Sequence, residues 1–172
     1  MTLIEDILLK SKKGLQFDNF ADENLFESYV LMAELLNPED SYNYTQIGTG
    51  IWRYQDIFEN YIFVRIVYQP VSDPYFEVKT WWIDENNKRI YNEIPKSSTS
   101  QDWDKRSNTI AKIFRDGIIP LFKKQKLSNA LKLIPVTKSR YYFSLRMAEK
   151  FIPKEWEIIE DFPKEIKILK QA

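Results

Sequence analysis

Alternating apolar and polar positions in the middle of the chain predict a set of paired strands. Residues 60–69 and 75–83 are rich in β-branched and aromatic side chains, which favour a pleated, half-buried surface. The segment between them, 69–74, contains two prolines and is typical of a turn. The same period of two predicts strands at 51–57 and 88–94. Because all the connections are short, we expect these four strands to form an antiparallel meander.

Apolar residues recurring at intervals of three and four residues predict helices before and after this meander in the sequence. Stripes of this kind cover residues 3–13 and 23–36 before it, and 105–122 and 140–152 after it. Pro120 lies inside the third of these, and we expect it to kink or end that helix.

Three other segments have weaker patterns. A polar linker with a short strand is expected at 39–50, and a short apolar strand that joins a sheet edge is expected at 130–136. In the tail the pattern suggests a helical turn around Trp156 and Ile159 and is ambiguous between strand and helix at 164–170.

The predicted elements indicate a single α+β domain spanning residues 1–172. An antiparallel β-meander of about four strands is expected at 51–94, flanked by N-terminal and C-terminal helices. The N-terminal segment, 1–38, is acidic and helical. The segment 104–152 is a basic helix–strand–helix unit, and 153–172 is a tail.

Charge is distributed unevenly along the chain, although Lys and Arg (25) balance Asp and Glu (25). Residues 1–50 carry nine acidic and three basic side chains, whereas residues 101–172 carry nine acidic and sixteen basic ones. Between Lys105 and Lys154 there are thirteen basic side chains and two acidic ones, Asp116 and Glu149. This asymmetry is the most unusual feature of the composition.

The basic segment 105–154 has three interpretations. It can bind an anion such as the phosphates of a nucleic acid, with Tyr142 stacking on a base. It can be a solvated face, or pair internally with the acidic helices. It can also meet the acidic half of another copy head to tail, which builds rings or filaments. The candidate contact residues are Lys112, Arg115, Lys123, Lys124, Arg140, Tyr142, Arg146 and Lys150.

Aromatic residues are abundant, with 11 Phe, 10 Tyr and 5 Trp. Trp81 and Trp82 are adjacent in a predicted strand, so their side chains must point to opposite faces. One of them is expected in the core, and the other against a helix or a partner. Trp103 lies in a polar loop and is a third candidate for an interface aromatic.

The chain contains no Cys and no His. This excludes Cys/His zinc sites, Ser-His-Asp triads and acid–base catalysis by histidine. The sequence Asp102-Trp103-Asp104 offers two carboxylates that can bind a divalent metal. A helix N-cap is the favoured interpretation of these aspartates, because a helix is predicted to begin there. No metal or other cofactor is expected.

We therefore expect a non-enzymatic protein–protein interaction or structural assembly subunit, which either binds another protein or self-assembles. A component of a larger particle, such as a phage neck or tail, is one example. The alternative is a nucleic-acid-associated protein that binds through residues 105–154. Residues 1–9 lack the features of a signal peptide, and no apolar run approaches the roughly 20 residues of a membrane-spanning helix. We expect no membrane association, and a location in the cytoplasm, or in a virion if the gene belongs to a phage.

Overall fold

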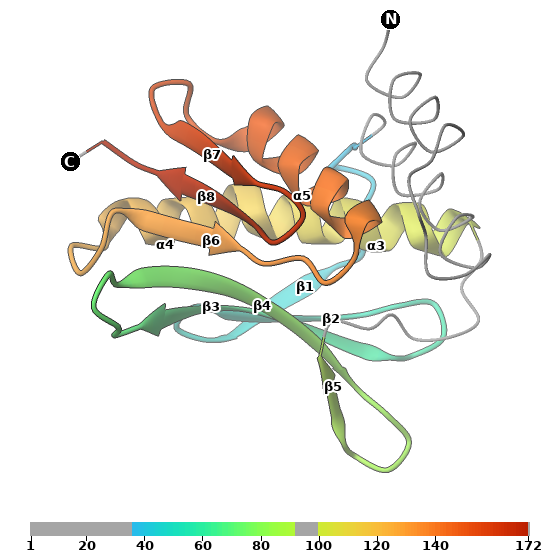
Figure 1. The fold of residues 1–172 in the computed structure, drawn as a ribbon. Helices are drawn as coiled ribbons and strands as arrows, with labels where there is room; N and C mark the ends of the chain where they lie inside the picture. Colours follow the sequence, from blue (N-terminus) through green and yellow to red (C-terminus); the bar gives the residue numbers. More distant parts are fainter. Residues whose placement is uncertain (1–35, 92–99, 172) are drawn as a thin grey trace, which may run out of the picture.

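One mixed sheet of eight strands organises the part of the chain that the structure describes. The structure, a computed structural model, describes residues 36–91 and 100–171. The helix expected at 3–13 and nearly all of the one expected at 23–36 lie outside these residues. Seven strands lie side by side in the order β1-β2-β3-β4-β6-β8-β7, and β5 pairs with β4 beside this path (Figure 1). The strands are β1 (Tyr44–Gly48), β2 (Ile51–Gln55), β3 (Tyr61–Gln69), β4 (Tyr75–Ile83), β5 (Arg89–Tyr91), β6 (Ala130–Leu133), β7 (Glu157–Asp161) and β8 (Glu165–Leu169).

The expected fold, a meander of about four strands flanked by helices, is wrong. The strands β1 to β4 do pair antiparallel in sequence order. The sheet then continues through β6, which runs parallel to β4 and places Phe76 opposite Leu131. It ends in the antiparallel hairpin of β7 and β8, which occupies the tail. The described part of the chain is therefore dominated by its sheet.

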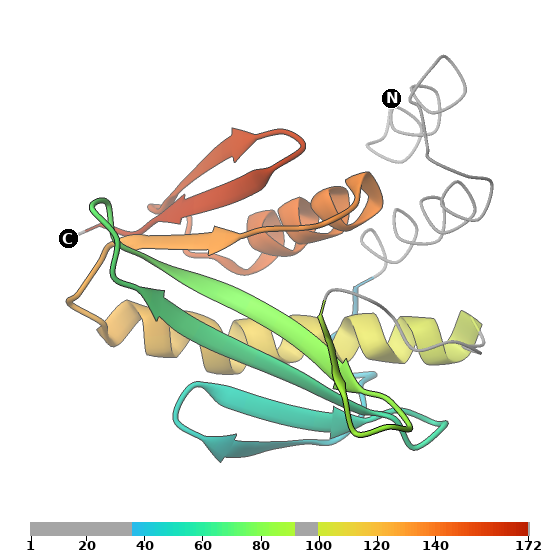
Figure 2. The same ribbon diagram turned by 60° about the horizontal axis from the view of Figure 1, so that its bottom comes forward.

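The helical part of the described chain is one long helix and α5 (Lys138–Phe151). The long helix has three consecutive segments, α3 (Ser100–Ile113), the π-helical η1 (Phe114–Ile118) and α4 (Ile119–Lys124). Figures 1 and 2 show the long helix running alongside the sheet, and α5 contacts β8. None of the helices in the described residues is long and apolar enough to cross a lipid bilayer.

Pro120 was expected to kink or end the long helix, and the structure excludes the second outcome, because the helix continues through it. The π-helical turn precedes it, with the Ile119 N–H bonded to the Phe114 carbonyl. This wider turn changes the hydrogen-bond pattern just before the residue that has no N–H to donate. The helix then continues to Lys124. Gly117 lies in the same turn and packs on Trp52: a Cβ placed there would lie 2.6 Å from the Trp52 ring.

The two faces of the sheet have different surroundings. One face packs against the long helix, where Phe76 of β4 meets Phe122 of α4 edge to face at 5.9 Å. The core on this side comprises Trp52, Tyr54, Ile62, Val64, Phe76, Leu131, Leu133, Ile166 and Ile168 together with buried helix residues. Side chains alternate between the faces, so Arg53, Phe63, Arg65, Lys79 and Trp81 lie on the opposite, outward face.

Candidate interaction surface

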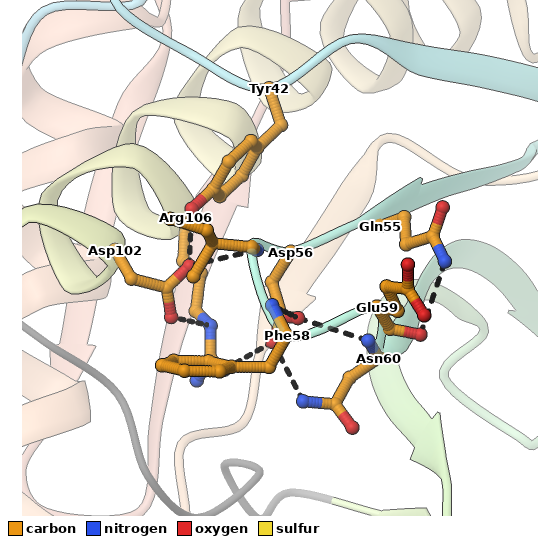
Figure 3. Close-up of polar contacts among 9 residues, drawn as sticks. Tyr42, Gln55, Asp56, Phe58, Glu59, Asn60, Asp102 and Arg106 are labelled. Atoms are coloured by element: carbon orange, nitrogen blue, oxygen red, sulfur yellow. Dashed lines mark hydrogen bonds and ion pairs between the residues drawn. The ribbon is translucent and has the colours of Figure 1, made fainter.

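A buried polar network joins α3 to the end of β2 (Figure 3). Arg106 forms an ion pair with Asp56, and its Nε lies 2.9 Å from the Asp102 Oδ2, one helical turn earlier. The side chain of Arg106 is 5% exposed and both carboxylates are 0% exposed. Burying such charges carries a large desolvation cost unless each is paired. Here the single guanidinium serves two carboxylates at once.

Asp102 is also tied to the chain that enters the sheet. Tyr42 donates its hydroxyl to Asp102 Oδ1, and the Ile57 N–H donates to the same oxygen at 3.3 Å. Burial, followed by this hydrogen bond to Asp102, raises the pKa of the Tyr42 hydroxyl well above its ordinary value. The phenol therefore stays protonated and serves as a donor to the carboxylate.

Asp56 organises the turn between β2 and β3, residues 56–60. Its Oδ1 accepts the N–H groups of Phe58 and Asn60, each at 2.9 Å, and its Oδ2 accepts the Asn60 side-chain amide at 3.0 Å. The backbone closes the turn, with the Asp56 N–H bonded to the Asn60 carbonyl at 3.1 Å. Glu59 adopts a φ of 64°, a conformation that costs energy for a residue with a side chain. The hydrogen bonds around Asp56 hold it there.

The turn fixed in this way exposes apolar side chains. Ile57 is 62% exposed and Phe58 is 43% exposed, although their backbone N–H groups reach the buried aspartates. Tyr61, the first residue of β3, is 42% exposed. Large apolar groups exposed on a turn that is held by hydrogen bonds are suited to contact another molecule.

Further polar side chains of α3 fix the segment before β1. The Asn108 side chain accepts the Asn37 N–H and donates to the Asp40 carbonyl, both at 2.9 Å. Thr109 Oγ1 accepts the Tyr42 N–H at 2.8 Å. These helix side chains provide the partners that a strand would otherwise supply, which lets this irregular segment lie against buried helix surface.

The basic candidates from the sequence do not form one uncommitted patch. Arg115 pairs with Asp116 at 2.7 Å and with Glu39 at 3.0 Å, and its hydrogen bond is the main cause of a lowered Asp116 pKa. Arg146 lies 3.5 Å from Glu149, and Lys150 donates to the Leu36 carbonyl at 2.6 Å.

The remaining candidates are spread over the long helix and α5. The aromatic one, Tyr142 on α5, packs on Phe162 at 5.6 Å and on Tyr141 at 5.8 Å. Lys112 lies at the end of α3, Lys123 and Lys124 at the end of α4, and Arg140 near the start of α5.

Trp81 and Trp82 occupy opposite faces of β4, as alternation requires. Trp82 lies on the helix-covered face, and its buried Nε1 has no hydrogen-bond partner among residues 36–91 and 100–171. Trp81 lies on the outward face but is only 4% exposed. Phe63 stacks on it at 5.3 Å and Tyr91 flanks it at 5.7 Å.

Neither aspartate of the Asp102-Trp103-Asp104 motif is the N-cap of the helix, which was the favoured interpretation. The helix begins at Ser100, so Asp102 lies in its first turn and is not the N-cap. Its carboxylate belongs to the Arg106 network, whereas Asp104 is exposed. The side chain of Trp103 lies outside the described residues. Within those residues no group of three or more Asp or Glu could hold a metal ion.

Sequence reasoning overlooked the three residues that build the site, Tyr42, Asp56 and Arg106. One signal was available: Asp102 and Arg106 are four apart on a predicted helix, the spacing of an ion pair. No local sequence feature indicated that Arg106 also pairs with Asp56, which lies 50 residues earlier in the chain.

Comparison with protein-family models gave no match, and no curated protein is significantly similar to the chain.

Proposed function

We propose that the protein is a non-enzymatic subunit that assembles with other proteins, in the first place with copies of itself. The observation that carries this proposal is the rigid turn at 56–60, which exposes Ile57 and Phe58 while Asp56 is locked to Arg106 beneath it. Such a turn is a preformed contact surface.

Rigidity supports a binding role for the turn. A loop that is already ordered loses less conformational freedom on association, so more of its contact energy is available for affinity. Large apolar side chains at the centre of a contact commonly contribute most of that energy. A buried ion pair adds little net stability compared with an apolar pair. Its use here fits the need for one defined turn conformation.

The ionisable groups of the site support a structural role for them. Asp56, Asp102 and Arg106 are each at most 5% exposed. A substrate cannot reach them in this conformation. The two aspartates accept backbone N–H groups of the turn, and Arg106 pairs with both carboxylates.

The distribution of charge along the sequence supports self-association. The first 50 residues carry a net charge of −6 and the last 72 a net charge of +7. Opposite charges on different parts of identical subunits steer head-to-tail contacts. A subunit of a larger particle, such as a phage neck or tail, must make such contacts with neighbouring subunits. Its location would be the cytoplasm or the particle itself.

The native mass of the full chain tests this proposal. Sedimentation over increasing protein concentration, at low and high salt, should show a mass that rises with concentration and falls with salt, because salt screens the charge attraction. A strictly monomeric protein at high concentration and low salt would refute self-assembly.

A further inference from the structure

A second surface lies on the outward face of β2, β3, β4 and β5. Four basic side chains occupy it, Arg53, Arg65, Lys79 and Arg89, one from each strand. Strand alternation places a single carboxylate among them, Glu77, which lies 4.0 Å from Lys79. The face therefore carries a local excess of positive charge in a protein whose formal net charge is zero.

Two of these cations are placed directly opposite each other. Arg65 on β3 is the register partner of Lys79 on β4. Like charges in this position destabilise a sheet. No carboxylate among the described residues pairs with Arg65, which is exposed. An anionic ligand spanning the two strands would relieve this repulsion.

Aromatic rings accompany the cations on the same face. The Arg53 guanidinium lies 4.8 Å from the centre of the Tyr61 ring, and that of Arg89 lies 5.3 Å from the Trp81 ring. Tyr61 is 42% exposed and Tyr91 is 48% exposed. Trp81 itself is enclosed by its neighbours, so the accessible rings are the two tyrosines.

We infer that this outward face binds single-stranded nucleic acid. Its phosphates pair with Arg65, Lys79 and Arg89, and its bases stack on Tyr61 and Tyr91. Proteins that bind single strands combine a basic track with exposed aromatic rings in this way, because every base has a stacking face. Side chains on the face of a sheet reach bases only when these are not enclosed in a duplex. An acidic peptide would pair with the cations, but its carboxylates would not stack on the tyrosine rings.

The cations of this surface belong to neither region considered so far. They lie outside the basic segment 105–154, and the 56–60 turn has no basic residue, although Tyr61 directly follows that turn. Binding here therefore adds a function to the proposed assembly role, and either can fail without the other.

Fluorescence anisotropy with the full chain tests the inference. The probes are labelled oligo-dT and oligo-U of about 12 nucleotides, within the usual site size of such surfaces, and a labelled polyglutamate. Both oligonucleotides should bind at about 50 mM salt and weaken steeply towards about 200 mM. The relative affinities for oligo-dT and oligo-U show whether DNA or RNA is the preferred ligand.

The decisive variant is Arg65→Gln with Arg89→Gln. It should weaken oligonucleotide binding at least about tenfold and reduce the salt slope by about 1.4, because each phosphate contact of a single strand contributes about 0.7. Its matched control is Lys123→Gln with Lys124→Gln, which removes the same charge from exposed positions on α4 and should leave affinity and slope unchanged. Circular dichroism should show the same fold for both.

Tyr91→Ala separates nucleic acid from an acidic protein partner. Loss of a stacking ring should weaken oligonucleotide binding about fivefold or more and leave polyglutamate unaffected. Three results would overturn the inference. The first is that neither oligonucleotide binds at low salt, and the second is that the α4 control loses binding while the sheet variant keeps it. The third is that polyglutamate binds as tightly as oligonucleotide and Tyr91→Ala has no effect. The last would assign the face to an acidic protein.

Discussion

Arg106 and Asp56, 50 residues apart, form an ion pair whose side chains are 5% and 0% exposed. The pair connects the middle of α3 to the residue from which the 56–60 turn begins. Through it a helix on one side of the sheet sets the conformation of a loop at the sheet's end. The same ion pair therefore contributes to the stability of the fold and fixes the conformation of the exposed 56–60 turn.

Replacing Arg106 with Leu should destabilise the fold strongly. The change removes the guanidinium that pairs with the buried carboxylates of Asp56 and Asp102, and breaking a buried pair in this way costs about 3–5 kcal/mol. The measurement is the free energy of unfolding in urea. Arg115→Leu is the control: its pair with Glu39 is 33% and 70% exposed, and such pairs contribute less than about 1 kcal/mol. Similar losses in the two variants would contradict the structural role given to Arg106.

Gly117→Ala should lower stability although alanine is the better helix former. The added Cβ would lie 2.6 Å from the Trp52 ring, and overpacking of this kind costs about 1–3 kcal/mol. Adding Trp52→Leu removes the obstructing ring, so the double variant should lose less than the sum of the single losses. Additive losses in a thermal or urea double-mutant cycle would show that Gly117 and Trp52 do not compete for space.

Alkaline pH should remove the contribution of Tyr42. The raised pKa of its hydroxyl means that the folded form holds this proton more tightly than the unfolded chain, whose value is 10.0. Its contribution is therefore complete below that pH and is lost as the pH rises above it. The advantage of wild type over Tyr42→Phe should shrink by about 1.4 kcal/mol between about pH 8 and about pH 11. Urea unfolding at the two pH values measures it, and an advantage that does not change with pH would contradict the buried hydrogen bond to Asp102.

The local pattern was sufficient to place the central strands but not to assemble the sheet. The stretches at 60–69 and 75–83 alternate over nine residues each in β3 and β4, and a proline-containing turn separates them. The parallel contact of β4 with β6 brings Phe76 next to Leu131. Their separation in the chain includes a long helix, and no local property of either segment encodes that pairing.

The hairpin of β7 and β8 was not predicted as such. Ile159 was expected in a helical turn and lies in β7, and the segment 164–170, which holds β8, was ambiguous between strand and helix. The segment Glu165–Leu169 has only five residues, with alternating buried Ile166 and Ile168. Its other members, Glu165, Lys167 and Leu169, are residue types that favour helices. Strand conformation is decided by pairing with β6, which places Ile168 opposite Leu131 and Ile166 opposite Leu133. Tertiary contacts override propensity here.

The candidate site was predictable only in part. Basic residues in the sequence drew attention to 105–154, but Arg115 and Arg146 lie beside acidic neighbours. Arg106 stood in the same segment and was not distinguished from them, because burial and the partner Asp56 are properties of the fold. The outward cations of β2 to β5 are separated in sequence and are brought together only by strand register.

The most direct test of the central claim compares two double variants by sedimentation. Ile57→Ser with Phe58→Ser removes the apolar side chains of the turn and keeps the backbone N–H groups that Asp102 and Asp56 accept. Val71→Ser with Leu127→Ser removes apolar groups that are 53% and 62% exposed elsewhere. We predict that the turn variant is monomeric at concentrations where wild type and the second variant associate. Association of the turn variant equal to that of wild type would contradict the claim that the 56–60 turn is the contact surface.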